Sequence, residues 1–127
     1  MDTTVDQTER AYRAALYEVD GIGPRRMRVL LDAFGSAKRV WEEKDATLRE
    51  IGLSEKVVAE LQRRRRNVEP AEHLRALAKL GIRVVLIEDE EYPELLKQIE
   101  YPPPVLFARG HFEIADRRAE ILSIRRR

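Results

Sequence analysis

Val19-Asp20-Gly21-Ile22-Gly23-Pro24-Arg25-Arg26, followed by an amphipathic segment over residues 27–34, is the stretch of sequence that decides the fold. Two glycines around one aliphatic residue let the backbone reverse between two helices, because glycine adopts positive φ without a steric penalty from a Cβ atom. Pro24 suits the first turn of the helix that follows. The pattern is typical of a helix-hairpin-helix turn between two short helices.

The same turn has the chemistry of an anion site. Free N–H groups at the start of the second helix, and the positive end of its dipole, attract anions. Arg25 and Arg26 stand where a phosphate would lie. The turn therefore predicts contact with a nucleic-acid backbone that is independent of base sequence and sensitive to salt, because binding releases counterions. The alternative is a tight interhelical turn that binds no ligand.

A second segment echoes the first. Residues 48–53 repeat the aliphatic and glycine pattern of residues 19–23, and aliphatic residues at helical spacing follow each segment. Ser54 replaces the second glycine, although serine is a good N-cap and can still help to hold a phosphate. Lys56 takes the place of the arginines. The repeat predicts two pseudosymmetric hairpins, and the candidate DNA-binding residues are Gly21, Gly23, Arg25, Arg26, Gly52, Ser54 and Lys56.

Hydrophobic periodicity places the helices of this part. We expect helices at about 7–18, 24–34 and 36–43, a short turn from Asp45 or Thr47, and a helix that opens at 52–56 and runs to about residue 66. Asp6 followed by Glu9 resembles a capping box at the first helix. Two hairpins packed face to face would form a compact domain of about four or five helices. Its core candidates are Leu16, Ile22, Leu30, Leu31, Phe34, Val40, Trp41, Leu48, Ile51, Leu53, Val58 and Leu61.

The pattern changes after residue 67. A helix from Pro70 to about Lys79 precedes a β-branched run at 82–87, which has the length and composition of a strand. A short helix after Tyr92-Pro93 should turn Leu95, Leu96 and Ile99 inward. Consecutive prolines at 102–104 force an extended link into a second strand at 105–108, and residues 119–124 supply a third. This order predicts the opening of a parallel α/β sheet.

Composition limits the class of protein. The chain has 127 residues, enough for one ordinary domain or two very small ones. Its 43% hydrophobic and 37% charged residues predict a globular, highly charged protein. There is no apolar run of about 18 residues and no signal-peptide pattern, so we expect a soluble cytoplasmic protein with no membrane contact.

The sequence lacks the residues that several kinds of catalytic and metal site require. Without cysteine, disulfides, thiolate zinc sites and thiol nucleophiles are excluded. His73 and His111 alone cannot form a histidine-rich metal site, and the acidic segment 88–91 lacks the EF-hand pattern, which favours a solvated loop. No Ser-His-Asp arrangement, paired-carboxylate site or phosphate loop is recognisable. We expect a non-enzymatic protein with no cofactor and no metal.

Net charge does not by itself indicate a nucleic-acid binder, because it is only +1. Local clusters of arginine carry that inference, although a GC-rich genome would produce the same bias. The run Arg63 to Arg66 is most simply a solvated helix C-terminus that complements the dipole, and DNA contact is the alternative. Tyr92, Tyr101 and Phe107 have the chemistry to stack bases, but their proline and aliphatic neighbours favour packing.

Taken together, these residues resemble the DNA-processing protein A family, also called Smf. The resemblance rests on Gly21-Ile22-Gly23, on Gly81-Ile82 before a strand, on Tyr92-Pro93-x-Leu95-Leu96-x-x-Ile99, and on Pro103-Pro104-Val105-Leu106-Phe107-x-x-Gly110. It covers about residues 10–126, which are similar to the family's N-terminal portion. It implies a sterile-alpha-motif-like (SAM-like) or helix-hairpin-helix domain joined to an extended Rossmann fold, single-stranded DNA binding, and loading of a RecA-type recombinase in natural transformation.

The chain departs from the family near residue 124. Where the family has a strand followed by Gly-Ser/Thr-Arg, this chain has Ile121-Leu122-Ser123-Ile124-Arg125-Arg126, without the glycine. Arg125 alone occupies a matching position. In the family the domain that follows carries the main single-strand DNA pocket and the dimer contacts. We therefore expect a truncated or frameshifted member, or a stand-alone paralogue of the N-terminal region.

The fold class that follows is α+β and rich in helix. We expect a flexible N-terminus over residues 1–8, a tandem helix-hairpin-helix, SAM-like domain over 9–67, and an incomplete α/β, Rossmann-like segment over 68–127. The expected function is weak, sequence-independent DNA binding, to single strands by the resemblance, with a RecA-type recombinase as a second partner. The alternatives are a protein-interaction or regulatory module that does not bind DNA, and a nonfunctional remnant.

Overall fold

A computed structural model of the chain describes residues 6–109, which form a helix-rich α+β fold with one small sheet. The predicted third strand at 119–124, the turn at Gly110 and the matching Arg125 lie outside the described residues. The helices are α1 (Gln7–Tyr17), α2 (Pro24–Phe34), α3 (Ala37–Glu42), α4 (Asp45–Glu50), α5 (Glu55–Asn67), α6 (Pro70–Lys79) and α7 (Glu94–Lys97), and the strands are β1 (Ile82–Leu86) and β2 (Val105–Arg109). Each helix predicted from periodicity is present, and the short turn predicted after residue 45 is the helix α4.

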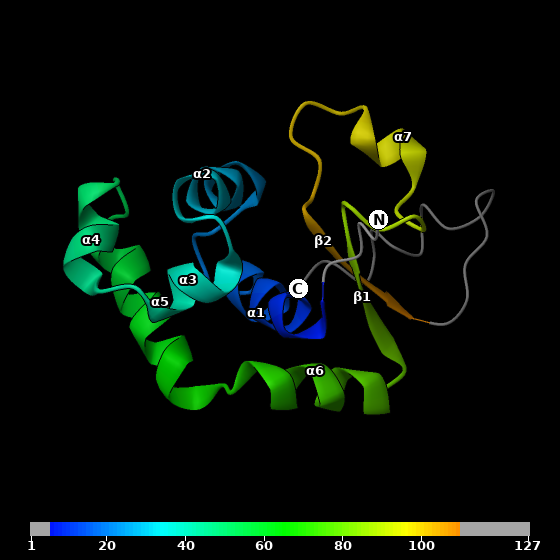
Figure 1. The fold of residues 1–127 in the computed structure, drawn as a ribbon, viewed down its shortest axis with the longest axis horizontal. Coiled ribbons are helices and arrows are strands. Elements are labelled where there is room, and N and C mark those ends of the chain that lie inside the picture. The colour runs from blue at the N-terminus through cyan, green and yellow to red at the C-terminus, as the bar shows by residue number, and fades with distance from the viewer. Residues whose placement is uncertain (1–5, 110–127) are drawn as a thin grey trace.

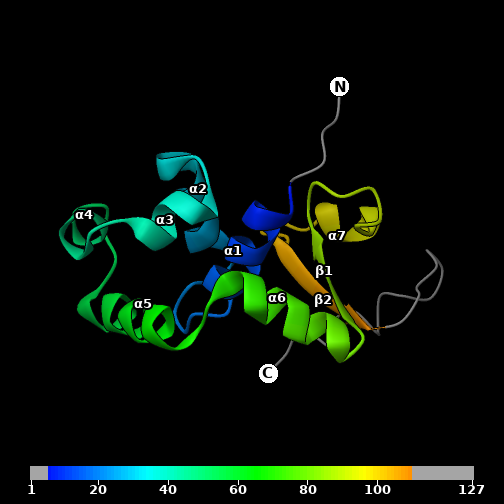
Figure 2. The same cartoon turned by 60° about the horizontal axis from the view of Figure 1, so that its bottom comes forward.

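Helix α1 lies at the centre of the molecule, with α2 to α5 on one side and the sheet on the other (Figures 1 and 2). It packs against α3, α6 and both strands. Its buried positions include Ala11, Ala14 and Ala15, and such small side chains let neighbouring elements approach closely. One core cluster therefore contains residues of α1 to α5 together with Val84, Leu86, Val105 and Phe107 of the strands.

The predicted core is confirmed in its main members. Leu16, Leu30, Leu48 and Leu61 have no exposed surface. Three predicted members are only partly buried and pack against the edge of the core: Leu31, Phe34 and Ile51.

The start of α1 is capped as predicted, but only in part. The Asp6 carboxylate accepts a hydrogen bond from the Glu9 amide at 2.9 Å. Glu9 does not complete a capping box, because its carboxylate instead accepts from the amides of Ala37 (2.7 Å) and Lys38 (3.3 Å). Glu9 therefore satisfies free N–H groups at the start of α3, where a negative charge also complements the helix dipole.

Two glycine turns join α1 to α2 and α4 to α5. Gly21 and Gly52 have φ of +97° and +108°, a conformation that glycine adopts without strain. The residue after each glycine is buried, since Ile22 is 3% and Leu53 is 6% exposed. Gly21 also lies against α5, where an added Cβ would come within 2.6 Å of a Val57 methyl carbon. The first turn is therefore fixed by close packing as well as by backbone conformation.

The two strands pair antiparallel, so the predicted parallel arrangement is wrong. Ile82 lies opposite Arg109 and Leu86 opposite Val105. A parallel pair needs a crossover that carries the chain back along the sheet, and α7 is only one turn long. Hydrogen bonds instead join the two ends of the connection: the Ile87 amide donates to Pro104 O (3.1 Å) and the Tyr92 hydroxyl donates to Pro103 O (2.6 Å).

Helix α7 buries only one of its three predicted inward residues. Leu96 is 7% exposed, whereas Leu95 and Ile99 are 55% and 49% exposed. Leu95 lies about 100° around the helix from Leu96, and α7 ends at Lys97, so Ile99 lies beyond the helix and does not follow its periodicity. The expectation that Leu95 and Ile99 turn inward is therefore corrected.

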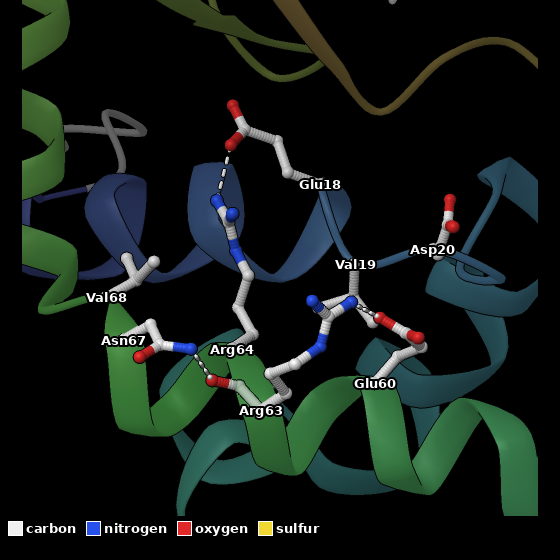
Figure 3. Close-up of a pocket in the computed structure, with 8 residues that line it drawn as sticks. All are labelled: Glu18, Val19, Asp20, Glu60, Arg63, Arg64, Asn67 and Val68. Atoms are coloured by element: carbon white, nitrogen blue, oxygen red, sulfur yellow. Dashed lines mark hydrogen bonds and ion pairs between the residues drawn. The ribbon is translucent and has the colours of Figure 1, made fainter.

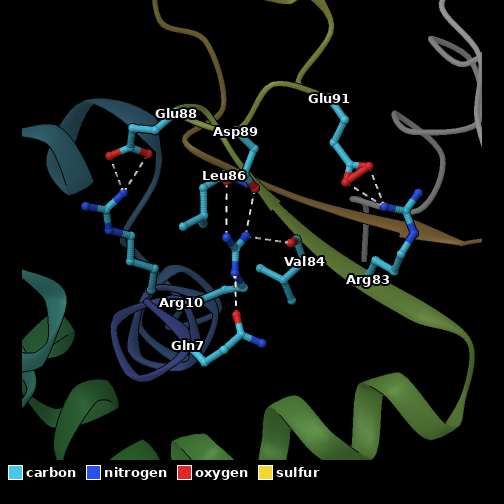
Figure 4. Close-up of polar contacts among 9 residues, drawn as sticks. Gln7, Arg10, Arg83, Val84, Leu86, Glu88, Asp89 and Glu91 are labelled. Carbon is cyan, nitrogen blue, oxygen red and sulfur yellow. Dashed lines mark hydrogen bonds and ion pairs between the residues drawn. The ribbon is translucent and has the colours of Figure 1, made fainter. Parts of the chain in front are cut away.

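The acidic segment 88–91 is largely exposed, as composition suggested, but Asp89 is partly buried and ion pairs connect the segment to α1 and β1. The Arg10 guanidinium contacts Asp89 at 2.7 and 3.2 Å and also donates to Val84 O (Figure 4). Arg13 contacts Glu88 at 2.6 Å. Glu91 pairs with Arg83 of β1. The loop thus holds the end of β1 against α1 by charge-assisted hydrogen bonds.

Asp89 is the most enclosed carboxylate of this loop. Burial by itself raises its pKa, but hydrogen bonds from Arg10 and from the Leu86 amide, with the positive charge of Arg10, hold the pKa below its ordinary value.

None of the described helices is long and apolar enough to cross a lipid bilayer.

We predict that Asp89→Asn lowers the free energy of unfolding by roughly 1.5–3 kcal/mol at neutral pH, because it removes the charge from hydrogen bonds to Arg10. Since the folded pKa of Asp89 is lowered, its stabilisation is present above about pH 4 and is lost as pH falls further. The difference between the two proteins should therefore shrink in acid, as measured by urea unfolding at several pH values. The control is Glu88→Gln, which removes a more exposed pair and should cost under about 1 kcal/mol.

We also predict that Gly21→Ala destabilises the chain more than Gly52→Ala. Both substitutions place alanine at positive φ, at a cost of about 1–2 kcal/mol, but only the first meets Val57. The additional overlap should cost about 1–3 kcal/mol. A double-mutant cycle with Val57→Ala, followed by chemical denaturation, should show favourable coupling at Gly21 and none at Gly52. Equal losses at the two glycines would contradict the packing argument.

Candidate nucleic-acid interface

The two glycine turns meet at one hollow on the surface, with a volume of about 480 Å³. One turn joins α1 to α2 and the other joins α4 to α5, so residues about thirty positions apart in sequence share one site. Five of the seven predicted binding residues line it. The lining residues are Gly21, Gly23, Pro24, Arg25, Arg26, Val29, Leu30, Ile51, Gly52 and Leu53, and together they are called the glycine-turn hollow below.

The start of α2 at this hollow has no side-chain cap. Gly23 is the N-cap residue and offers no side-chain oxygen, and Pro24 has no N–H group. Within the described residues, the amides of Arg25 and Arg26 have no hydrogen-bond acceptor. A helix start with free amides and a positive dipole end favours an anion.

The two arginines of the hollow are exposed but differ in their contacts. Arg26 donates to the Gly21 carbonyl oxygen at 2.7 Å, which ties its guanidinium to the turn. The Arg25 guanidinium lies over the ring of Tyr101, 5.2 Å from its centroid. Neither forms an ion pair with a carboxylate of the described chain, so their positive charges are not neutralised by it.

Ser54 and Lys56 do not line the hollow, although Leu53 beside them does. The Ser54 hydroxyl caps α5 by accepting from the Val57 amide at 3.2 Å. Lys56 is exposed in the first turn of α5 and has no acidic partner in the described part of the chain. Ser54 therefore gives α5 the side-chain cap that α2, which begins after Gly23, does not have.

Three residues of this surface were missed by sequence reasoning. Val29 lines the hollow four positions after Arg25, so helical spacing was a usable signal. Ile51 was predicted only as core, yet it is half-buried and lines the hollow. Tyr101 was expected to pack against its neighbours but is 41% exposed. Its contact with Arg25 joins segments far apart in sequence, and no local pattern predicts it.

Arg63 and Arg64 of the arginine run on α5 line a second hollow, of about 370 Å³, between the ends of α1 and α5 (Figure 3). Arg64 pairs with Glu18 and also donates to Ala15 O, and Arg63 pairs with Glu60. Arg65 donates to the carbonyls of Val40 and Glu43. The run is therefore not simply a solvated helix end, because Arg64 and Arg65 connect α5 to α1 and α3.

His73 also belongs to this network of charged residues. Its Nε2 atom lies 3.0 Å from the Glu18 carboxylate, which thereby joins α1, α5 and α6. Burial raises the pKa of Glu18, but the hydrogen bond to His73 and the charge of Arg64 outweigh this and lower the pKa overall. Both arginines that line this second hollow are thus paired with carboxylates that line it as well. In the described range 6–109, no three histidine, aspartate or glutamate side chains are grouped as a metal ion would require.

Comparison with known proteins agrees with the motifs. A family model described as DNA recombination-mediator protein A matches residues 83–124, which contain α7, β2 and all of β1 but its first residue. The chain is also 28% identical over 115 residues to Protein Smf of Synechocystis sp.. That alignment covers 90% of this chain and 29% of the relative, so the chain spans less than a third of that protein's length.

The order of the motifs, the family model and the alignment along nearly the whole chain point to the same relatives. On this evidence the chain is similar to the DNA recombination-mediator protein A family over residues 83–124 and to the portion of Protein Smf that its alignment covers, in agreement with the motifs.

Proposed function

We propose that this chain binds DNA through the sugar–phosphate backbone at the glycine-turn hollow. The observation that carries the proposal is the convergence of two glycine turns with Arg25 and Arg26, both without a carboxylate partner, on one surface. Phosphates are the ligands that suit this surface, because guanidinium groups and helix-start amides both donate hydrogen bonds to them. The family description, a recombination mediator, supports DNA as the ligand class.

The two hairpins, α1–α2 and α4–α5, are proposed to act as a tandem helix-hairpin-helix unit. Both turns place glycine at positive φ, then a buried aliphatic residue, then the N-cap of the next helix. The first turn leaves its amides free, whereas Ser54 occupies the equivalent amide of the second. The first turn is therefore proposed as the main phosphate contact, with Gly52 as its neighbour across the hollow and Lys56 as an outlying charge.

Binding by this chain is proposed to be weak and sequence-independent. Most other arginines near the core are paired with carboxylates, so Arg25, Arg26 and Lys56 are the principal contributors of the proposed site. Contacts to phosphate position a protein without reading base sequence. The role proposed is binding rather than catalysis, and a RecA-type recombinase is proposed as the partner that would receive the DNA.

A protein-interaction role is the competing proposal. The observation that favours it is the apolar part of the hollow, where Val29 is 51% exposed beside Ile51 and Leu53. Size-exclusion chromatography with and without an oligonucleotide distinguishes the two. A complex that elutes earlier with the oligonucleotide supports DNA binding, whereas self-association that is indifferent to the oligonucleotide supports the competing role.

We predict that Arg25→Glu with Arg26→Glu weakens DNA binding by roughly 10- to 100-fold, because two charge-assisted contacts are lost and repulsion replaces them. Fluorescence anisotropy with a labelled oligonucleotide at low salt measures the change. The matched control is Arg75→Glu with Lys79→Glu on α6, which alters net charge equally at exposed positions away from the hollow. If the two double variants lose affinity equally, bulk charge rather than the glycine-turn hollow explains the binding.

We predict a shallow dependence of affinity on salt. About three cationic contacts to a single strand give a slope of roughly −2 in a plot of log K against log salt concentration. Affinity should therefore fall about 15- to 20-fold between 50 and 200 mM salt. The Arg25 and Arg26 double variant should flatten the slope by more than 1, and a slope that it leaves unchanged would place the phosphate contacts elsewhere.

A further inference from the structure

Tyr101 lies beside the glycine-turn hollow although it belongs to the link between α7 and β2. That link passes close to the start of α2 (Figure 1), and the Arg25 guanidinium lies 5.2 Å from the Tyr101 ring centroid. Among the aromatic side chains of residues 6–109, Tyr101 alone is exposed, with 41% of its surface accessible. Tyr92 and Phe107, which sequence analysis considered beside it, are 3% and 7% exposed and belong to the core.

The link holds this ring in a defined place. Prolines at 102–104 restrict the backbone directly after Tyr101. The Pro103 carbonyl accepts from the Tyr92 hydroxyl at 2.6 Å, and the Pro104 carbonyl accepts from the Ile87 amide at 3.1 Å. An exposed aromatic ring on an anchored segment loses little conformational freedom when a ligand covers it.

A cation over an aromatic ring is favourable by itself, so the contact with Arg25 also has a purely structural explanation. Two features point beyond it. The ring keeps much of its surface exposed despite the arginine, and the same arginine lines the hollow proposed to hold phosphate. A nucleotide carries its base next to its phosphate, so a phosphate near Arg25 brings a base within reach of Tyr101.

From this arrangement we infer that Tyr101 stacks on a nucleobase of the DNA strand whose phosphate contacts Arg25. The inference rests on the proposed function, since it requires a strand in the glycine-turn hollow. Bases of an intact duplex are stacked on one another and cannot cover the ring, whereas unpaired bases stack on aromatic side chains. Tyr101 is thereby the residue that makes this site discriminate single strands from duplex DNA.

The test compares two labelled oligonucleotides, a thymidylate strand and a strand of the same length made of abasic sites, which keeps the phosphates but lacks bases. Affinities are measured by anisotropy for the full chain and for Tyr101→Ala and Tyr101→Phe. The unaltered chain should bind the thymidylate strand roughly 5- to 150-fold more tightly than the abasic strand. Tyr101→Ala should lose most of this preference, and Tyr101→Phe, which keeps the ring, should retain it.

Three other outcomes overturn the inference. Equal weakening of both strands by Tyr101→Ala means that the ring only positions Arg25. An unchanged preference in Tyr101→Ala means that bases stack elsewhere, and equal binding of both strands by the unaltered chain means that bases are not contacted at all. In each of these cases the loss caused by Arg25→Glu with Arg26→Glu still supports phosphate binding, whereas failure of the unaltered chain to bind either strand overturns both proposals.

Discussion

Burial of α1 is the constraint on which the other elements depend. Its alanine-rich face lets α3, α6 and the sheet approach the same helix. Its polar side chains then form hydrogen bonds and ion pairs with the neighbouring elements. Glu9 satisfies amides of α3, while Arg10 and Arg13 bind the loop that follows β1. Asp89 is enclosed by this arrangement and still remains charged, because Arg10 offsets the cost of burial. The helix is thus both the hydrophobic centre and the point where the sheet is attached.

The same packing brings the two glycine turns together. Gly21 lies so close to Val57 that a larger residue would push the first turn away from α5. That contact sets the first turn and its arginines beside Gly52, and the glycine-turn hollow is the result. Gly21 is therefore required both for the backbone conformation of its turn and for the contact of that turn with α5, and the proposed phosphate site depends on this contact.

Arginine has two different roles in this chain, and its position in the fold separates them. Arg10, Arg64 and Arg65 are partly enclosed and bound to carboxylates or carbonyls of other elements. Arg25 and Arg26 lie on the surface without carboxylate partners and remain available to a ligand. Composition alone cannot make this distinction, because the charge of a run such as residues 63–66 is the same whether it faces solvent, a carboxylate or a phosphate.

The sequence by itself determined what neighbours along the chain decide: helix boundaries set by Pro24 and Ser54, the positive-φ turn at Gly21, and most of the core through its periodicity. Only the tertiary structure decided the antiparallel pairing of the strands, the pairing of the acidic loop with α1, the outward positions of Leu95 and Ile99, and the meeting of Arg25 with Tyr101. The physical reason is the distance along the sequence between the residues that interact. Caps, turns and periodicity are interactions within a few residues, whereas the ion pairs and the ring contact join segments that come together only when the whole core closes around α1.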